Sequence, residues 1–302
     1  MFDKQCYVVF LMSNEVLKDG KILSGKALSK IIRAQIKEEV AKLKEQFNED
    51  ITLATILVGE NPASKLYVSM KHKACHKAGI NSINHHLPED TSEKELLELI
   101  DKLNKDPSVN GILVQLPLPD HINERNVINA MDPKKDVDGF HPYNVYETFY
   151  KRGRLEAATP KGVIRMLDYM KEDLVGKDVT LINRSIIVGK PLALMLINRS
   201  ATVTVCHSKT RDLAEKARRA DILITAIGRR KSKEDPYFIT EDMVKEGAVV
   251  IDVASPYGDV DLENVLHKVK WITPVPGGVG PMTVTMLLEN VVIAYKIQKG
   301  LM

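Results

Sequence analysis

The chain contains 302 residues, and 43 lysines and arginines against 40 aspartates and glutamates leave a formal net charge of +3. At about 150 residues per domain, this length predicts two domains. A hydrophobic content of 44% with 27% charged residues excludes a mostly disordered chain. The small net charge argues against a nucleic-acid or polybasic membrane binder, and no apolar run approaches the roughly 18 residues of a membrane span. We therefore expect neither a nucleic-acid nor a membrane partner.

The cysteines and the first residues indicate the cellular compartment of the protein. Cys6, Cys75 and Cys206 are odd in number, widely spaced and without a CxxC pair, which predicts reduced thiols and a cytoplasmic protein rather than a disulfide framework or a zinc site. Residues 1–12 lack the long apolar core and small-residue cleavage site of a signal peptide. We expect an N-terminal extension, flexible or forming an extra strand, with Met12 as an alternative start.

Helix-like and strand-like segments alternate through the first half. The pattern predicts elements at 24–47 (helix), 51–58 (strand), 63–78 (helix), 80–87 (strand), 92–103 (helix) and 111–115 (strand). Such alternation is typical of an α/β domain with a mostly parallel sheet. Residues 132–158 lack periodicity and are expected to form a long functional loop or a connection.

The second half repeats this alternation. Thr159 and Pro160 are suited to cap and start a helix. Further elements are predicted at 179–182 (strand), 191–198 (helix), 201–206 (strand), 212–220 (helix), 221–227 (strand) and 248–253 (strand). This βαβαβ series indicates a Rossmann-like half. The last helix, 281–296, has no single apolar stripe and is expected to be buried on several sides.

The turn from Asn183 to Pro191 joins a strand to a helix, where free N–H groups favour an anion. It matches neither G-x-G-x-x-G nor a P-loop, so an ordinary βα turn is equally consistent. The next strand ends at Cys206 with no acid before Asp212, and Arg184 lies on the same edge. This arrangement favours a 2′-phosphate, and hence NADP over NAD. Thr210 as a simple N-cap is the alternative.

Polar residues in the first half could carry chemistry. Tyr67 and Lys71 share a helix face, so a tyrosine that stacks on a flat substrate would lie beside a lysine that moves protons. Such a lysine needs a lowered pKa, and most lysines on this helix are expected to be solvated. Gln115 closes an apolar strand at the edge where α/β sheets bind ligands. Asp136 and Asp138 could bind a metal, but further ligands are missing; Asp138 could instead bind the N–H edge of a ring.

Four segments together identify a resemblance. They are Tyr67–Lys71 (YVSMK), Gly111–Pro119 (GILVQLPLP), Lys135–Asn144 (KDVDGFHPYN) and Pro274–Thr283 (PVPGGVGPMT). With the segments at 184–191 and 203–210, they are similar to the bifunctional methylenetetrahydrofolate dehydrogenase/cyclohydrolase (FolD) family over about residues 20–298. The resemblance implies oxidation of 5,10-methylenetetrahydrofolate with NADP and hydrolysis of the product to 10-formyltetrahydrofolate, without a metal. It also implies a role in one-carbon metabolism and purine biosynthesis.

The resemblance implies an α/β homodimer of two-domain subunits. Residues 13–155 with the helix 281–302 would form the folate-binding catalytic domain, and 156–280 the Rossmann-like NADP-binding domain. Lys71 would transfer protons, Gln115 would tune it, Tyr67 would pack on the folate and Asp138 would hold the pterin. Further substrate contacts are implied for Val114, Leu116, Pro276, Gly277 and Gly278. The implied NADP contacts are Asn183, Arg184, Ser185, Gly189, Pro191, His207, Ser208, Ser255 and Thr283.

The sequence departs from the family pattern at several positions. Asn183 stands where the family has glycine, Tyr146 replaces the glycine after His-Pro, Ala157–Pro160 reads AATP instead of PCTP, and the loop after Asp252 is shorter. A monofunctional enzyme and a non-catalytic folate- or nucleotide-binding paralogue therefore remain as alternatives.

Overall fold

The computed structural model describes residues 15–302, so the expected extension at 1–12 and Cys6 lie outside the described residues. Its contacts divide the chain into two compact α/β units. The seven-strand unit contains the described residues up to Ile31 together with Thr159–Thr283, and the three-strand unit contains Ile32–Ala158 and Val284–Met302. Within the described residues, every helix is too short or too polar to cross a membrane.

The sheet of the three-strand unit has the order β4-β3-β5 and is parallel throughout, as the alternation predicts. Its strands are β3 (Thr52–Val58), β4 (Asn81–Leu87) and β5 (Gly111–Val114). The central strand β3 is buried along its whole length, which explains its continuous apolar sequence. All three carboxyl ends lie at one edge, and Gln115 follows β5 directly there.

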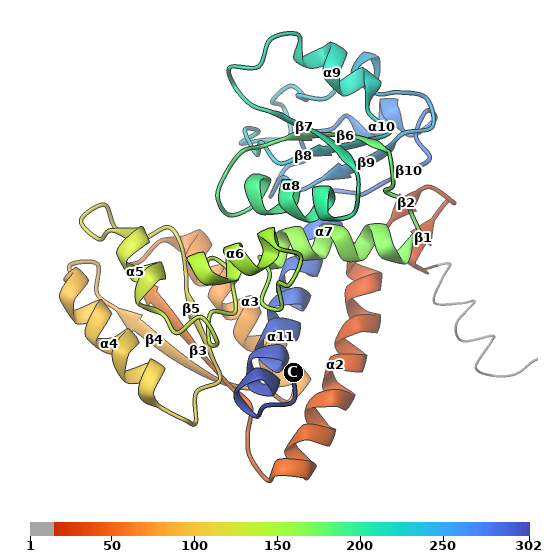
Figure 1. Cartoon of the computed structure of the whole chain (residues 1–302). Helices are drawn as coiled ribbons and strands as arrows, with labels where there is room; N and C mark the ends of the chain where they lie inside the picture. Colours follow the sequence, from red (N-terminus) through yellow and green to blue (C-terminus); the bar gives the residue numbers. More distant parts are fainter. Residues whose placement is uncertain (1–14) are drawn as a thin grey trace, which may run out of the picture. The chain divides into compact units, whose positions relative to one another are not determined.

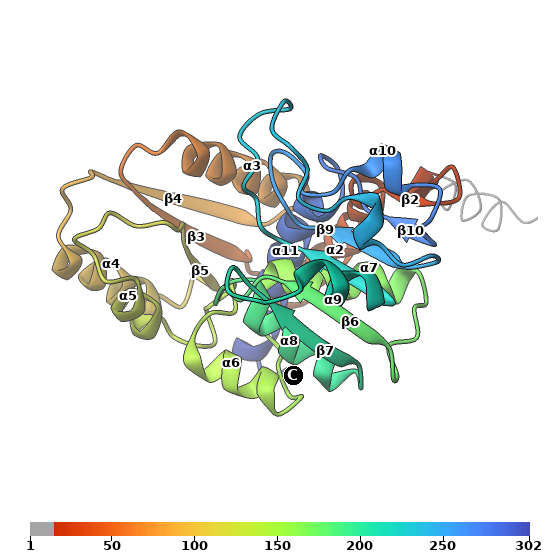
Figure 2. The same cartoon turned by 90° about the horizontal axis from the view of Figure 1, so that it is seen from above.

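The three-strand unit also contains helices. They are α2 (Gly25–Phe47), α3 (Pro62–Ala78), α4 (Glu93–Lys105), α5 (Glu124–Ala130), α6 (Pro142–Phe149) and α11 (Val279–Gln298); α2 and α11 begin in the other unit. A capping box between Ser92 and Glu95 starts α4, and its buried face joins that of α5 in one core with β3 and β5. Figures 1 and 2 show α4 and α5 side by side. Most of α11 is buried, as its missing stripe predicts.

Residues 132–158 are not one long loop, because they contain α6. His141 caps this helix by accepting a hydrogen bond from the Tyr143 N–H, and Pro142 occupies its first turn. With eight residues, α6 is too short to show a periodic apolar stripe, which is why the sequence pattern missed it.

The sheet of the seven-strand unit has the order β1-β2-β10-β9-β8-β6-β7. Its strands are β1 (Leu17–Lys18), β2 (Ile22–Leu23), β6 (Asp178–Ile182), β7 (Thr202–Cys206), β8 (Ile222–Thr225), β9 (Val249–Asp252) and β10 (Trp271–Ile272). Every pairing except β1 with β2 is parallel. The chain order reverses at β6, between β7 and β8, so the ligand crevice of such a sheet is expected at the carboxyl ends of these strands.

Short helices complete this unit. They are α7 (Ala158–Tyr169), α8 (Gly189–Asn198), α9 (Leu213–Arg219), η1 (Glu241–Met243) and α10 (Leu262–Val265). Both views place α8 beside β6 and β7 (Figures 1 and 2). The predicted Rossmann-like alternation is therefore present from β6 to β9.

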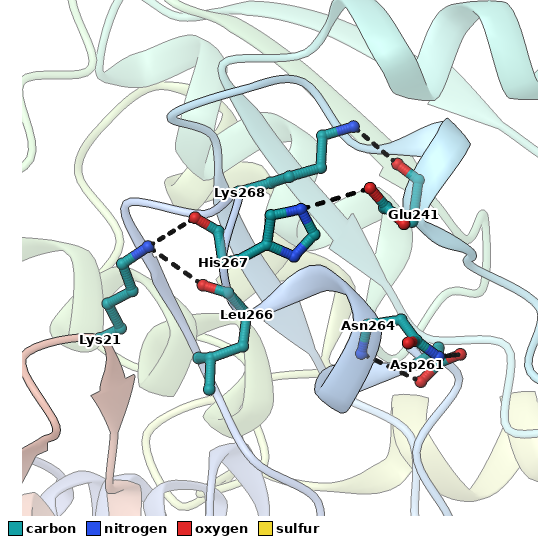
Figure 3. Close-up of polar contacts among 7 residues, drawn as sticks. All are labelled: Lys21, Glu241, Asp261, Asn264, Leu266, His267 and Lys268. Carbon is teal, nitrogen blue, oxygen red and sulfur yellow. Dashed lines mark hydrogen bonds and ion pairs between the residues drawn. The ribbon is translucent and has the colours of Figure 1, made fainter.

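The β1–β2 hairpin extends this sheet, although the sequence assigned all of 13–155 to the other domain. Ile22 pairs with Ile272 of β10. The Lys21 ammonium group donates to the carbonyl oxygens of Leu266 (3.1 Å) and His267 (2.8 Å), and so caps the end of α10 (Figure 3). Strands of two residues carry no period-two pattern, so their pairing could not be predicted.

Candidate active site

Lys71 and Gln115 are 44 positions apart in the sequence and meet in the structure. Lys71 lies on the buried face of α3 with 9% of its surface exposed. Its Nζ donates to Gln115 Oε1 over 3.0 Å. Gln115 in turn donates through Nε2 to the Leu116 carbonyl oxygen over 2.7 Å. This second bond turns the amide oxygen toward the lysine, so the pair has a fixed orientation.

Burial and Asp138 set the electrostatics of Lys71. Burial lowers the pKa of Lys71 from its ordinary value, and the charges of Asp138 and Cys75 oppose this change. Burial raises the pKa of Asp138, Lys71 opposes this, and Asp136 adds to it. The lowered pKa means that Lys71 loses its proton more easily than a solvated lysine, which is what a group that both takes and returns protons requires.

The loop that carries Asp138 is built on Asp136. The Asp136 side chain is fully buried and accepts hydrogen bonds from the backbone N–H groups of Gly139 (3.0 Å) and His141 (2.8 Å) and from Asn144 Nδ2 (2.9 Å). From α11, Asn290 Nδ2 donates to the Val137 carbonyl oxygen over 2.9 Å. Asp136 therefore shapes the backbone that holds Asp138. The two aspartates thus have different roles, which the sequence could not reveal.

Three other predicted substrate residues of this unit lie close to the pair along the chain. Tyr67 lies one helical turn before Lys71 on α3 and is 39% exposed, so its ring can reach a ligand. Val114 is buried in β5, and Leu116 is half-buried beside Gln115. The structure thus brings Lys71 and Gln115 into contact. Val114 and Leu116 flank Gln115 in the chain, and Tyr67 lies on the same helix as Lys71.

Pro276, Gly277 and Gly278 belong to the seven-strand unit. The Lys26 N–H donates to the Gly277 carbonyl oxygen over 2.9 Å. A Cβ at position 278 would lie 2.5 Å from the Pro274 carbonyl oxygen, and one on Gly25 would lie 1.9 Å from the Gly278 carbonyl oxygen. Close packing against the start of α2 therefore explains part of the glycine content of the segment 274–283.

A cavity of about 430 Å³ opens at the carboxyl ends of β6, β7 and β8. Five predicted cofactor residues line it: Asn183, Arg184, Ser185, His207 and Ser208. Its described lining contains no acidic residue, so its charge is positive. Sequence analysis missed Arg229 and Phe238, which also line it, although position 229 closely follows β8 at the ligand-binding edge.

The turn between β6 and α8 is organised by Asn183. Its Oδ1 accepts from the N–H groups of Ser185 (2.7 Å) and Gly189 (3.1 Å), while its Nδ2 donates to the Ala226 carbonyl oxygen (2.6 Å). A Cβ on Gly189 would lie 2.3 Å from the Asn183 carbonyl oxygen, so position 189 requires glycine. Pro191 is buried in the first turn of α8. The asparagine that departs from the family pattern therefore ties β6, α8 and the end of β8 together.

Two of the cavity-lining residues, His207 and Ser208, belong to the turn after β7, whereas Ser255 and Thr283 lie elsewhere. His207 and Thr210 form a tight turn after β7, in which Thr210 Oγ1 accepts from the His207 N–H over 2.8 Å, and Ser208 is exposed at its tip. The Thr283 hydroxyl lies 2.9 Å from that of Thr159. Neither Thr283 nor Ser255 lines the cavity.

A positively charged cavity at the carboxyl ends of a parallel sheet, in a chain that also carries a buried lysine–glutamine pair, is typical of a nucleotide-dependent enzyme. Sequence profiles make this specific. The tetrahydrofolate dehydrogenase/cyclohydrolase catalytic domain matches residues 23–138, and the NAD(P)-binding domain of the same enzymes matches residues 157–299. The chain belongs to the tetrahydrofolate dehydrogenase/cyclohydrolase family.

Relatives agree over most of the chain. The bifunctional protein FolD of Moorella thermoacetica is 53% identical over 285 residues, which are 92% of this chain and 99% of the relative. The crystal structure of the FolD enzyme from Campylobacter jejuni matches with a TM-score of 0.87 at 47% identity, covering 92% and 98% of the two chains. A Trypanosoma brucei FolD structure, complexed with NADP cofactor and inhibitor, matches with a TM-score of 0.85 at 33% identity, covering 91% and 97%.

Proposed function

We propose that this protein oxidises 5,10-methylenetetrahydrofolate to the 5,10-methenyl compound with NADP and hydrolyses that product to 10-formyltetrahydrofolate. It would thus be an oxidoreductase and a hydrolase in one chain. Family membership supports both activities. The single observation that carries the proposal is the buried Lys71, held by Gln115 at 3.0 Å, because a neutral or easily deprotonated amine suits the hydrolytic step.

NADP fits the cavity of the seven-strand unit. Arg184 and Ser208 offer a guanidinium and a hydroxyl group, and the described lining lacks the carboxylate that would bind the ribose 2′-OH of NAD. We infer that Arg184, Ser185 and Ser208 hold the phosphates and ribose. Gly189 and Pro191 would form the start of α8. We also propose that Asn183, His207, Ser255 and Thr283 contribute to cofactor binding. When bound, the cofactor supplies the hydride acceptor.

In the hydrolytic step, the residues of the three-strand unit manage protons. Water that adds to the methenyl carbon must lose a proton, and the nitrogen that leaves as the ring opens must gain one. Lys71 takes the first proton at Nζ and returns it to the nitrogen. Gln115 holds Nζ in place, Tyr67 packs on the folate, and Asp138 binds the pterin edge. Val114 and Leu116 line this region, and Pro276, Gly277 and Gly278 would approach the folate through backbone.

An absorbance assay of the purified protein tests the proposal. The protein is mixed with 5,10-methylenetetrahydrofolate and either NADP⁺ or NAD⁺, and the reduced cofactor and the methenyl compound are followed together. The proposal predicts turnover with NADP⁺ and methenyl decay faster than its spontaneous hydrolysis. Turnover without accelerated decay would indicate a monofunctional dehydrogenase, accelerated decay without turnover a monofunctional cyclohydrolase, and neither activity a binding-only paralogue.

The resemblance also supports a homodimer in the cytoplasm that serves purine biosynthesis. We propose the dimer together with a folate-binding domain at 13–155 plus 281–302 and an NADP-binding domain at 156–280, with the exception that the β1–β2 hairpin joins the sheet of the second domain. Sedimentation of the purified protein should give about 68 kDa, twice the 33.8 kDa chain. A species of the single-chain mass at micromolar concentration would contradict the dimer.

A further inference from the structure

The loop after β8 is fixed at its base by a buried carboxylate. Asp259 is fully buried and accepts hydrogen bonds from Thr225 Oγ1 (2.9 Å) and from the N–H groups of Ile227 (2.7 Å) and Gly228 (3.0 Å). Gly228 has a φ of +61°, a conformation that suits glycine. The backbone that enters position 229 is therefore held in one conformation.

The residue on the other side of position 229 is equally constrained. Arg230 is 7% exposed, and its guanidinium donates to the carbonyl oxygens of Asp235 (2.8 Å), Gly258 (2.9 Å) and Lys233 (2.7 Å). It also lies over the Tyr237 ring, 3.8 Å from the ring centre. Each of its three nitrogens thus donates to a carbonyl oxygen of the protein, and this buried arginine holds the loop.

Arg229 has the opposite character. It is exposed and lines the cavity with Arg184, Ser208 and Phe238. Within residues 15–302, no hydrogen bond, ion pair or ring contact engages its guanidinium. A cation without a protein partner, placed on a loop that both neighbours immobilise, is arranged to bind an anion with little loss of backbone entropy.

We propose that Arg229 binds the adenosine 2′-phosphate of NADP together with Arg184 and Ser208, and so determines the preference for the phosphorylated cofactor. This inference rests on the proposed use of NADP. The pyrophosphate of a dinucleotide belongs at the start of α8, whereas the 2′ substituent belongs beside the turn after β7. The cavity that Arg229 lines includes that second turn, at His207, Ser208 and Thr210. A guanidinium can bind a phosphate through two parallel hydrogen bonds.

Calorimetric binding of two small probes to the full-length protein tests the inference without turnover. The probes are 2′,5′-ADP, which carries the 2′-phosphate, and 5′-AMP, which lacks it. In Arg229→Gln, the affinity for 2′,5′-ADP should fall about tenfold or more, as expected for a charge-assisted phosphate contact. The affinity for 5′-AMP should stay unchanged, and Arg229→Lys should recover part of the loss. Lys231→Gln is the matched control, because Lys231 is exposed on the same loop but does not line the cavity.

Each other outcome overturns the inference in a distinct way. An equal loss for both probes would place Arg229 at another phosphate. If the unmodified protein prefers 2′,5′-ADP and Arg229→Gln binds it with unchanged affinity, Arg229 does not bind the 2′-phosphate. The proposed use of NADP would then stay intact. No preference for 2′,5′-ADP in the unmodified protein would overturn the NADP proposal itself, and this inference with it. An equal loss in Lys231→Gln would show a general charge effect.

Discussion

The two candidate binding regions of this protein use charge in opposite ways. In the three-strand unit, Lys71 is buried and its Nζ already has a protein partner, Gln115. In the seven-strand unit, Arg184 and Arg229 are exposed at a cavity. Burial moves the pKa of a lysine toward the range in which it can exchange protons, whereas phosphate recognition needs permanently charged groups that keep their donors for the ligand.

The two regions also differ in the structural elements that hold their site residues. Lys71 projects from the middle of a 17-residue helix, and Gln115 directly follows a buried strand. The cavity is lined largely by turns, whose conformations depend on Asn183, Asp259 and Arg230. Changes in the first region should therefore act on catalysis, while changes beneath the second should act on cofactor affinity and stability.

The largest expected effect is that of Lys71→Met. Methionine has a similar volume and cannot exchange a proton, so methenyl hydrolysis should fall at least about 100-fold, the lower end of general acid–base contributions. Binding of 2′,5′-ADP should remain unchanged, because the cofactor cavity lies in the other unit. An unchanged rate of 10-formyltetrahydrofolate formation would refute the role of Lys71.

A pair of aspartate variants distinguishes support from chemistry within one loop. Asp136→Asn should lower the free energy of unfolding by about 1–3 kcal/mol, because an amide nitrogen would face groups that now donate to a carboxylate. Asp138→Asn should change folate binding with little effect on stability. Urea unfolding and substrate KM measure the two effects. Equal loss of stability in both variants would contradict the division of roles.

A buried carboxylate in the seven-strand unit predicts a pH dependence of stability. Burial raises the pKa of Asp252 to about 7. Between its ordinary pKa of about 3.9 and this value, the folded state binds more protons than the unfolded state, so this group makes stability fall as pH rises, by at most about 1.4 kcal/mol per pH unit. Its contribution levels off above pH 7. The contribution of Asp252 is isolated by measuring the free energy of unfolding of the unmodified protein and of Asp252→Asn at pH 5, 6, 7 and 8. Parallel dependences of this free energy on pH would contradict the prediction.

The smallest expected effect is that of Asn183→Gly, which restores the residue usual in the family. The glycine would lose three hydrogen bonds, but the turn is half-buried and water replaces part of them, so we expect a loss of about 1 kcal/mol in stability. Cofactor affinity should fall a few-fold at most. Tighter cofactor binding in this variant would show that the asparagine hinders the site.

The sequence predicted the parts of the fold that carry long periodic patterns. Its α/β two-domain character is confirmed, and the amphipathic helix predicted at 92–103 is α4. The β1–β2 hairpin and α6 were missed because such short elements carry no pattern. The Lys71–Gln115 contact joins residues 44 positions apart, so only the family resemblance could suggest it.

Within the sites, sequence alone could not separate neighbours of the same type. Asp136 and Asp138 differ only in the groups that surround them, as do Arg229 and Arg230. Whether a charged side chain bonds to the protein or remains available to a ligand depends on tertiary contacts, which residue identity does not encode.

The pH–rate profile of methenyl hydrolysis tests the central claim most directly, namely that a buried lysine of lowered pKa moves the protons. The enzymatic rate, after subtraction of the spontaneous rate, should rise with pH through an inflection below the ordinary lysine value of about 10.4 and then level off. This inflection should vanish in Lys71→Met. An inflection at the ordinary value, or the same inflection in Lys71→Met, would contradict the account.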